Sequence, residues 1–521
     1  MSEMTIEPLM TEPAGVPRGR AMVERADWAS RAYAKYDITT VNKIVEAAAH
    51  ALAKNAQEYA ARAVQETGFG VADHKLIKNL ACSTGFLDAY RGHDYVSHRI
   101  DEANKIVEIP RPAGVILALT PSTNPVATVS FKILLSLMTR NAIIISPHPL
   151  ARKVCADAAK AMADAAIAAG APDGIIQVVE EPSIPLINAL MTDERVDVIV
   201  ATGGTPVVRS AYRSGNPAIG VGPGNVPVLV DSTADIAKTA ERIIDSKSFD
   251  NSILCTNESV VIVEENVADK LIAAFQRNGA YVLNHDEVDK IRHAVFPSGH
   301  FNPKLVGKDA TSIAELAGIR VPARTRVLVA PFELVVPEEP LAHEKLLPVL
   351  GLVRVPTARR GVEVAKAILR ITGAGHSAAI HSNDAALVMH FSAAVPVLRV
   401  SVNVGNSLGS SGFHTNLAPS MTIGTGYAGR SSVGENLQPK HLINFTRIAY
   451  NADVKEAMPS YQGLSPWSAP RGPVPVYPRA SNDNPTFDAS RVRTPQTSDV
   501  SELRDEIRRL IVEELQELMK G

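Results

Sequence analysis

Short apolar segments alternate with helical patterns along this chain, and the alternation constrains the fold more than any other feature. Four apolar runs of strand length, separated by segments with helical spacing, occupy residues 114–120, 141–146, 174–180 and 196–202. A second series of such runs occupies residues 259–265, 326–330, 349–355, 377–382 and 397–404. Continuous apolar strands alternating with helices are typical of a parallel sheet covered on both faces. The sequence therefore predicts an α/β protein with two parallel-sheet domains that join near residues 226–235.

Charge and cysteine usage exclude several classes of protein. Lys and Arg number 53 against 55 Asp and Glu, so the net charge of −2 gives no basis for binding nucleic acid or an anionic membrane. The apolar runs are far shorter than the roughly 20 residues of a membrane span. The three cysteines have no paired spacing, which argues against a disulfide framework and against a CxxC metal site. We expect a cytoplasmic protein without a metal, and the acidic N-terminus does not resemble a secretory signal.

The two ends of the chain differ in composition from the middle. Residues 1–17 carry three prolines and no periodicity, which predicts a flexible arm, whereas residues 21–90 have a helical pattern with a stop at Gly68. Seven prolines fall between residues 462 and 499, so this segment is predicted to be an extended linker. Residues 500–521 have one apolar stripe opposite charged residues and predict an amphipathic helix. That helix either folds back on its own subunit or docks in a groove of another protein.

Cys255 is the first candidate for chemistry, although a lone mid-chain cysteine is most often an inert buried residue. Three other segments strengthen the candidate. Asn124 follows a predicted strand in a loop bounded by prolines, where its amide can donate to an oxygen that gains negative charge. Gly203 and Gly204 lie between a strand and a helix, so backbone N–H groups at the helix N-terminus face a site of phosphate size. A glycine-rich turn then leads into a strand at residues 218–230.

Seven sequence blocks, in order, resemble the aldehyde dehydrogenase superfamily and within it the CoA-acylating branch. The blocks are PSTNP, SPHP, ATGGTPVVRSAY, GVGPGNVP, SFDNSILCTNES, HEKLLPVLGL and GHSAAIHS, and the resemblance covers roughly residues 20–455. This branch includes the acetaldehyde and propionaldehyde dehydrogenases of bacterial microcompartments and the aldehyde half of bifunctional aldehyde-alcohol dehydrogenases. The resemblance implies an NAD-binding domain at 18–231, with oligomerisation strands near 96–112. It also implies a catalytic domain at 232–425 and a return segment with a further oligomerisation strand at 426–461.

The resemblance also implies residue roles. Cys255 is the thiolate that attacks the aldehyde carbon, and the oxygen of the resulting thiohemiacetal lies between the Asn124 amide and the backbone N–H of Cys255. Hydride passes to a nicotinamide, and the thiol of CoA then releases an acyl-CoA. In hydrolytic relatives a general-base glutamate precedes the cysteine, and its position here is Val221, which cannot activate water. This favours CoA over water, with Glu258 as an alternative acid whose simpler interpretation is a hydrogen-bonded loop residue.

The cofactor residues are likewise carried over from the family. Ser146, Pro147 and His148 occupy the position where hydrolytic relatives hold the adenosine ribose, and that block has no Lys or Arg for a 2′-phosphate, so NAD is favoured over NADP. The resemblance assigns the pyrophosphate to a glycine-rich site and the nicotinamide ribose to a glutamate; these residues are Thr202, Gly203, Gly204 and Glu344. His376 matches a histidine particular to the branch and is either a loop anchor or a group near CoA.

One glycine motif does not fit a nucleotide-binding role. Residues 424–429, GTGYAG, match GxGxxG literally but follow no clear strand and precede no clear helix. In the family a glycine-rich loop near the substrate pocket lies here, so Arg430 and Ser431 are candidates to face substrate. The favoured substrate is a short aldehyde, propanal or acetaldehyde. Sulfoacetaldehyde bound through residues such as Arg430, or an inactive scaffold of the same fold, is the alternative.

The resemblance extends to assembly. Strand segments near residues 98–112 and 441–451 resemble those that build a dimer, so a homodimer or a tetramer made of two dimers is expected. The linker and terminal helix resemble encapsulation peptides of microcompartment enzymes. We therefore expect residues 500–521 to bind shell or core proteins in the lumen of a bacterial microcompartment.

Overall fold

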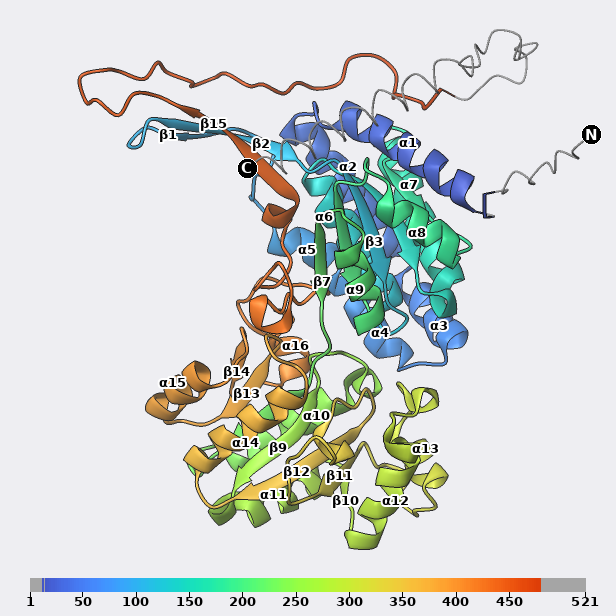
Figure 1. The fold of residues 1–521 in the computed structure, drawn as a ribbon, viewed down its shortest axis with the longest axis vertical. Coiled ribbons are helices and arrows are strands. Elements are labelled where there is room, and N and C mark those ends of the chain that lie inside the picture. The colour runs from blue at the N-terminus through green and yellow to red at the C-terminus, as the bar shows by residue number, and fades with distance from the viewer. Residues whose placement is uncertain (1–11, 14, 479–521) are drawn as a thin grey trace, which may run out of the picture. The chain divides into compact units, whose positions relative to one another are not determined.

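The computed structural model describes residues 12–13 and 15–478 (Figure 1). Its first part is helical, as the sequence predicts, and consists of α1 (Val16–Tyr33), α2 (Ile38–Lys54), α3 (Ala56–Thr67), α4 (Ala72–Ala81) and α5 (Thr84–Ala89). Pro17 already belongs to the first turn of α1, a position that tolerates proline. The helical stretch predicted to stop at Gly68 does so, with Gly68 at φ 72°, but it is interrupted at Asn55, which lies outside helical geometry.

The first sheet has five parallel strands in the order β5 (Ile176–Val178), β4 (Ala142–Pro147), β3 (Val115–Thr120), β6 (Val198–Thr202) and β7 (Ala218–Val221). The helices between them are α6 (Pro125–Met138), α7 (Arg152–Ala168), α8 (Ile184–Thr192) and α9 (Thr205–Arg213). Every residue of β3 and β4 is buried, which explains why these strands appear in the sequence as unbroken apolar runs. We call residues 16–221 the first lobe.

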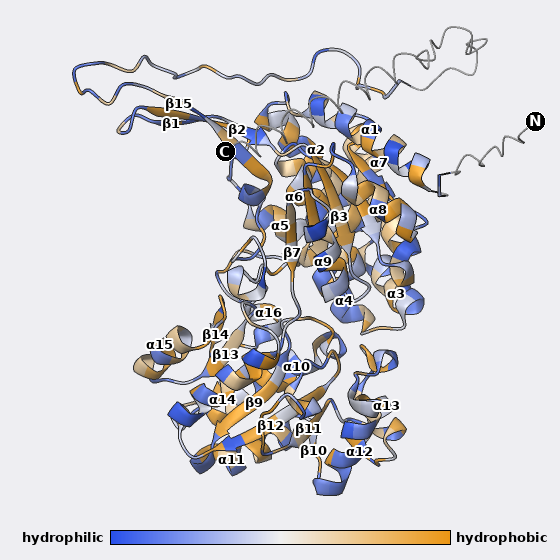
Figure 2. Cartoon of the chain, viewed as in Figure 1, coloured by the Kyte–Doolittle hydropathy of each residue, from blue (hydrophilic) through white to orange (hydrophobic). Residues whose placement is uncertain are grey.

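The second sheet has seven parallel strands in the order β10 (Ala280–Val282), β11 (Val327–Pro331), β12 (Val349–Val355), β9 (Glu258–Glu264), β8 (Val226–Val230), β13 (Ala378–His381) and β14 (Val400–Val402). Its helices are α10 (Ile236–Ser248), α11 (Glu265–Arg277), α12 (His285–Val295), α13 (Ala310–Leu316), α14 (Ala358–Ile371), α15 (Ala385–Ala394) and α16 (Asn406–Gly409). Figure 2 shows hydrophobic strands in both sheets. We call residues 226–409 the second lobe.

Side-chain alternation gives the second sheet an apolar core on each face. Val260 and Ile262 belong to one buried cluster, whereas Val261 and Val263 belong to another. Successive side chains of a strand point to opposite faces, so both faces of β9 are covered. These two sheets confirm the predicted α/β class with two parallel sheets.

The chain passes from one sheet to the other between Val221 and Val226. This is several residues before the expected domain boundary at 231–232, and it places β8 in the second sheet, paired with β9 and β13. The sequence pattern does not mark this boundary because β7 and β8 are both short, apolar and buried.

A third, antiparallel sheet joins two distant segments in the order β1 (Arg99–Asp101), β2 (Ile106–Pro112) and β15 (Ile443–Ala449). These are the segments expected to form the oligomerisation strands. The region after β15 runs without helix or strand as far as the structure describes it (Figure 1).

The described part of the predicted linker packs on the first lobe. The indole Nε1 of Trp467 donates to the carbonyl of Val96 at 2.8 Å, and the ring centroid lies 4.2 Å from the guanidinium carbon of Arg140. The amide of Asp173 donates to the carbonyl of Pro475 at 3.0 Å. The linker is therefore anchored at its start. The helix predicted at residues 500–521 lies outside the described residues, as does most of the N-terminal arm.

No helix within residues 15–478 has both the length and the apolarity that crossing a membrane requires.

Candidate active site

A cavity of about 830 Å³ opens at the carboxyl ends of the first sheet's strands and is closed by loops of the second lobe. Ligands of open α/β sheets characteristically bind at these strand ends. The cavity is lined by all of the residues predicted to act in catalysis or to bind the cofactor, except two: Asn124, Ser146, Pro147, His148, Thr202, Gly203, Gly204, Cys255 and Glu344. Val221 also lines it. Segments more than 200 residues apart in the sequence, such as those of Asn124 and Glu344, therefore meet at one site.

Cys255 follows a tight turn between α10 and β9. Asp250, Asn251 and Ser252 have φ values of 50°, 52° and 63°, in the left-handed region that costs a non-glycine residue about 1–2 kcal/mol. Side-chain hydrogen bonds hold this turn: the Asn251 amide donates to the carbonyl of Gly307 at 2.9 Å, and the Ser252 hydroxyl donates to Asn257 Oδ1 at 2.6 Å. Of the three cysteines, only Cys255 is partly exposed.

Burial is the largest influence on the Cys255 thiol and raises its pKa to about 12. The neighbouring Glu344 carboxyl raises this pKa further, while Arg399 acts in the opposite direction. In the free protein the thiol is therefore protonated at neutral pH, and attack on a carbonyl requires that this proton leaves.

Asn124 occupies the N-cap position of α6, yet its side chain makes no cap hydrogen bond. Instead its Oδ1 accepts from Lys78, and its Nδ2 lies 3.3 Å from Thr123 Oγ1. The side chain is only 8% exposed and lines the same cavity as Cys255. The amide is thus available to a ligand rather than spent on the helix terminus.

Glu344 is fixed by the segment that connects the two sheets. The amide of Gly224 donates to Glu344 Oε1 at 3.1 Å, and burial raises the pKa of this carboxyl to about 8. A Cβ at residue 224 would lie 1.9 Å from the carbonyl oxygen of Cys255. Glycine at this position allows the connecting segment to pass directly behind the nucleophile loop.

The start of α9 offers backbone donors to an anion. Gly204 is the N-cap residue, and no side chain caps the helix there. His148 lines the same cavity; its imidazole Nδ1 accepts from the amide of Leu150 at 3.2 Å, and burial lowers its pKa. Exposed backbone N–H groups and a neutral imidazole suit a dinucleotide pyrophosphate and its ribose. No lysine or arginine is among the described residues that line the cavity.

Two predicted residues, His376 and Glu258, do not line the cavity. His376 is fully buried, its Nδ1 lies 3.0 Å from Ser377 Oγ, and burial lowers its pKa to about 3. Glu258 is also buried, accepts from the amide of Asn406 at 2.6 Å, and has a pKa raised to about 6 by burial. Both contacts fit residues that stabilise loops.

The two residues after the GTGYAG segment lie outside the cavity lining as well. Arg430 is exposed, and the hydroxyl of Ser431 donates to the carbonyl of Gly220 at 2.6 Å. No strand precedes the motif, so the sequence argument against a nucleotide-binding role agrees with the fold.

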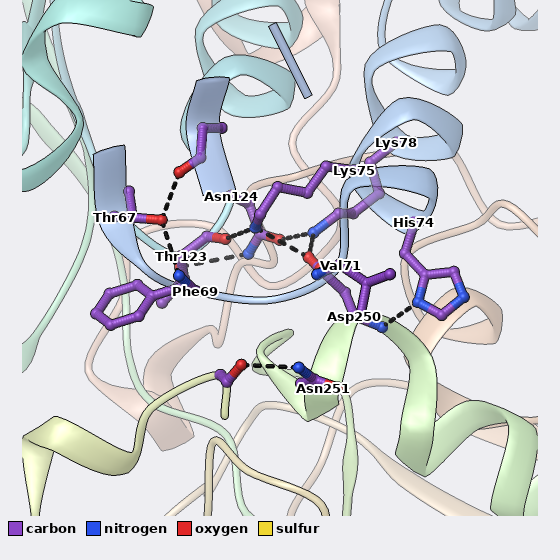
Figure 3. Close-up of polar contacts among 12 residues, drawn as sticks. Thr67, Phe69, Val71, His74, Lys75, Lys78, Thr123, Asn124, Asp250 and Asn251 are labelled. Atoms are coloured by element: carbon purple, nitrogen blue, oxygen red, sulfur yellow. Dashed lines mark hydrogen bonds and ion pairs between the residues drawn. The ribbon is translucent and has the colours of Figure 1, made fainter. Parts of the chain in front are cut away.

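Sequence reasoning missed a buried ionic cluster next to Asn124, which consists of Lys75, Lys78 and Asp250 (Figure 3). Both lysines extend from α4 toward the turn that precedes Cys255, and their side chains are 3% and 1% exposed. A signal was present in the spacing of three residues, which places both lysines on one helix face together with buried Asn79.

The chain is similar to a known protein family and to individual members of it. The model of the aldehyde dehydrogenase family matches residues 13–293. An aldehyde-alcohol dehydrogenase of Clostridium acetobutylicum is 41% identical over 429 residues, which are 81% of this chain and 49% of that protein. The chain thus spans about half the length of this curated relative. A succinate-semialdehyde dehydrogenase (acetylating) of Clostridium kluyveri is 38% identical over 448 residues, 85% of this chain and 98% of that one.

Solved structures and a further relative agree with this family. The crystal structure of an acetylating aldehyde dehydrogenase from Geobacillus thermoglucosidasius matches with a TM-score of 0.83 and 38% identity, over 86% of this chain and 98% of that chain. A propionaldehyde dehydrogenase from the Clostridium phytofermentans fucose utilisation bacterial microcompartment matches with a TM-score of 0.75 and 29% identity, over 83% and 97%. A sulfoacetaldehyde dehydrogenase (acylating) of Cupriavidus necator is 34% identical over 452 residues, 85% of this chain and 91% of that one. The resemblance inferred from the sequence is confirmed: the chain belongs to the aldehyde dehydrogenase family, among its CoA-acylating members.

Proposed function

We propose that this protein oxidises a short-chain aldehyde to an acyl-CoA, with NAD as the hydride acceptor and Cys255 as the nucleophile. The observation that carries the proposal is that Cys255, a partly exposed residue, and the side-chain amide of Asn124, which makes no cap hydrogen bond, line the same cavity. A nucleophile and a donor for the oxygen of the attacked carbonyl are the minimum that acyl chemistry of this kind requires.

The chain's own groups account for the carbon–sulfur chemistry. After losing its proton, the Cys255 sulfur adds to the aldehyde carbon, and the carbonyl oxygen gains negative charge. The Asn124 amide and the backbone N–H of Cys255 donate to that oxygen. A bound nicotinamide supplies the acceptor for the hydride that leaves the same carbon. The thiol of CoA then attacks the resulting thioester: its sulfur takes the acyl group as the carbon–sulfur bond to Cys255 breaks, its proton is lost, and the released Cys255 thiolate takes up a proton.

The nature of the cavity wall favours CoA over water as the second nucleophile. Val221 stands where hydrolytic relatives carry their general base, and it lines the cavity. Among the described lining residues, Glu344 is the one carboxylic acid, and its contact with Gly224 holds it in the region assigned to the ribose. Without a base to activate water, the thioester persists until a thiol arrives.

The residues that line the cavity favour NAD as the cofactor. Glu344 would accept from the nicotinamide ribose hydroxyls, and the start of α9 would hold the pyrophosphate at Gly203 and Gly204. NAD is preferred to NADP because the described cavity lining has no cationic side chain to neutralise a 2′-phosphate.

The substrate is proposed to be propanal or acetaldehyde. The same lining, which has no cationic side chain among the described residues, suits a small neutral aldehyde better than a sulfonate, and Arg430, the residue considered for sulfonate binding, lies outside it. The sulfoacetaldehyde alternative is kept because an acylating relative of that specificity is similar to this chain. Parallel assays with propanal and sulfoacetaldehyde separate the two.

We also propose a location and an assembly state for the enzyme. We place the enzyme in the lumen of a bacterial microcompartment, with residues 500–521 as the docking segment, and we propose a homodimer or tetramer built through β1, β2 and β15. A microcompartment enzyme among the similar structures supports the first point.

Stoichiometry of NADH formation tests the chemistry. Without CoA we expect a burst of about one NADH per subunit, because the acyl group remains on Cys255; adding CoA should start steady turnover. The Cys255→Ala variant should show neither phase, whereas Cys155→Ala, which alters a buried cysteine outside the cavity, should keep both. Steady NADH formation by wild type without CoA, or any by Cys255→Ala, would contradict the proposal.

A further inference from the structure

We infer that Lys78 is a positioning residue for Asn124: its ammonium group holds the amide with the N–H side toward the reacting oxygen and strengthens it as a donor. The inference rests on the proposed function and adds a residue from α4, in the helical N-terminal region, to the machinery around Cys255. Figure 3 shows Lys78 and Lys75 reaching from α4 to Asn124, Thr123 and Asp250.

The contact with Lys78 determines which side of the Asn124 amide holds the oxygen and which holds the nitrogen. An ammonium group has three donors and no acceptor, so the Asn124 atom that it contacts must be the oxygen. The nitrogen Nδ2 then necessarily occupies the other position, where one N–H can reach Thr123 Oγ1 and the second remains free. Rotating the amide by 180° would set two donors against each other in a buried place, which is costly. Lys78 therefore fixes the orientation that an oxyanion requires.

Besides orienting the Asn124 amide, the positive charge of Lys78 strengthens it as a hydrogen-bond donor. Hydrogen bonds to an ionised group are roughly twice as strong as neutral ones, and a cation on the amide oxygen draws electron density away from the nitrogen. The ionic cluster next to Asn124 contains two ammonium groups and one carboxylate, nearly without exposure to solvent. Of the two ammonium groups, Lys78 is the one that contacts the Asn124 oxygen, so its positive charge acts through the amide on the point where the reaction develops a negative charge.

Asp250 explains why the charge of Lys78 is tolerated in the interior. Its Oδ2 accepts from both Lys78 and Lys75, the latter at 3.1 Å, and its Oδ1 accepts from the amide of Val71 at 2.6 Å. Burial alone would raise the pKa of Asp250, but Lys78 and Lys75 outweigh burial and hold it below its usual value. Asp250 is thus an ionised counter-ion.

The same carboxylate belongs to the left-handed turn that precedes Cys255. A Cβ at Gly70 would lie 2.1 Å from Asp250 Oδ1, and the imidazole Nδ1 of His74 accepts from the Asp250 amide at 2.8 Å. The loop before α4 and α4 itself therefore surround Asp250 on several sides. One ionic cluster connects the oxyanion donor, through Lys78, with the turn that carries the nucleophile.

Lys75 provides a matched control within the same cluster. It lies three residues from Lys78 on α4, pairs with the same Asp250 oxygen and donates to the carbonyl of Thr123 at 3.2 Å, but it makes no hydrogen bond to the Asn124 side chain. Replacing either lysine by methionine removes one ammonium partner of Asp250. Only Lys78→Met also removes the donor to Asn124.

The test is a double-mutant cycle on CoA-dependent NADH formation by the full-length protein. We expect Lys78→Met to lower kcat by about 10- to 100-fold, somewhat less than the loss of a whole oxyanion donor, with KM for the aldehyde within about twofold. Lys75→Met should stay within about threefold of wild type. In an Asn124→Ala background, Lys78→Met should lower kcat by less than about twofold relative to Asn124→Ala alone, because the amide through which Lys78 acts is absent.

Folding and function are controlled separately. Thermal melts report whether each variant is folded, and Lys78→Gln replaces Lys78→Met in the cycle if the methionine variant does not fold. Equal losses in Lys78→Met and Lys75→Met, or a full additional loss of activity in the Asn124→Ala background, would overturn the inference while leaving the proposed function intact. A wild-type protein that forms no NADH with any aldehyde and CoA would overturn both.

Discussion

At the residue scale, the proton on Cys255 is controlled by burial and by one neighbouring carboxyl. Burial raises the pKa of the thiol to about 12, and Glu344 adds to this shift. Glu344 itself has a pKa raised to about 8 by burial, so it becomes a full charge only in mildly alkaline solution. The two groups therefore influence each other mainly above pH 8.

Alkylation of the free protein by iodoacetamide measures this coupling. Because pH 7–9 lies well below the thiol pKa, the thiolate fraction and the alkylation rate should rise about tenfold per pH unit in Glu344→Gln, and less steeply in wild type, where Glu344 gains its charge near pH 8. In Glu344→Gln the thiol pKa falls, so alkylation should be a few-fold faster than in wild type above pH 8 and little changed at pH 7. Glu338→Gln, a substitution of an exposed residue, is the control, and Cys255→Ala gives the background of the other cysteines. A wild-type rate that stops rising below pH 8 would contradict the expected shift.

The sequence revealed residues whose chemistry is carried by a local pattern. Cys255 and Asn124 lie in short loops between regular elements, and both could be named before the fold was known. Lys78 and Asp250 could not, because they are 172 residues apart and only tertiary packing removes them from water. Glu258 is suggested by its closeness to Cys255 in the sequence and His376 by the family resemblance, yet both side chains make their contacts outside the cavity lining.

At the element scale, the segment between β7 and β8 is the tightest constraint around the nucleophile. It connects two sheets, lines the cavity at Gly222 and Pro223, and anchors Glu344 through the amide of Gly224. The strand patterns predicted most strands of both sheets, but β10 is only three residues long and leaves no clear signal. The sequence pattern also did not predict the left-handed turn before Cys255, because asparagine and aspartate adopt this conformation only where their side chains find hydrogen-bond partners.

Gly224→Ala should therefore damage the site more than the fold. Its Cβ would meet the Cys255 carbonyl oxygen at 1.9 Å, and both segments are held by flanking strands, so the nucleophile loop must shift. We expect activity to fall by about 100-fold or more, with a loss of stability of about 1–3 kcal/mol. Gly222→Ala is the matched control, because its nearest neighbours lie at 3.8 Å, and it should remain within a few-fold of wild type. Similar activities for the two variants would show that the contact can relax.

At the scale of the whole molecule, the described chain consists of two lobes, an antiparallel sheet and an anchored extended segment. The contacts of Trp467 with Val96 and Arg140 bind the start of the predicted linker to the first lobe. The sequence indicated the absence of helix and strand there but not these contacts, because a single tryptophan among prolines has no periodic pattern.

Two truncations separate the roles of the C-terminal region. Deleting residues 500–521 should leave kcat, KM and the melting temperature unchanged, because the cavity and its supports lie within residues 15–478. It should abolish co-purification with microcompartment shells. Deleting residues 462–521 should in addition lower the melting temperature, because Arg140 loses its contact with the Trp467 ring. Shell association that survives the shorter deletion would rule out docking by this segment.

The lysines of α4 and the aspartate before Cys255 also have a thermodynamic consequence. Each lobe has its own hydrophobic core, which by itself would allow the two to unfold independently. The ionic cluster, however, is divided between the lobes: both lysines belong to α4 of the first lobe, and Asp250 belongs to the second. Separating the lobes leaves charged groups on both surfaces without their partners, so the free energy that holds either core together includes a contribution from the other.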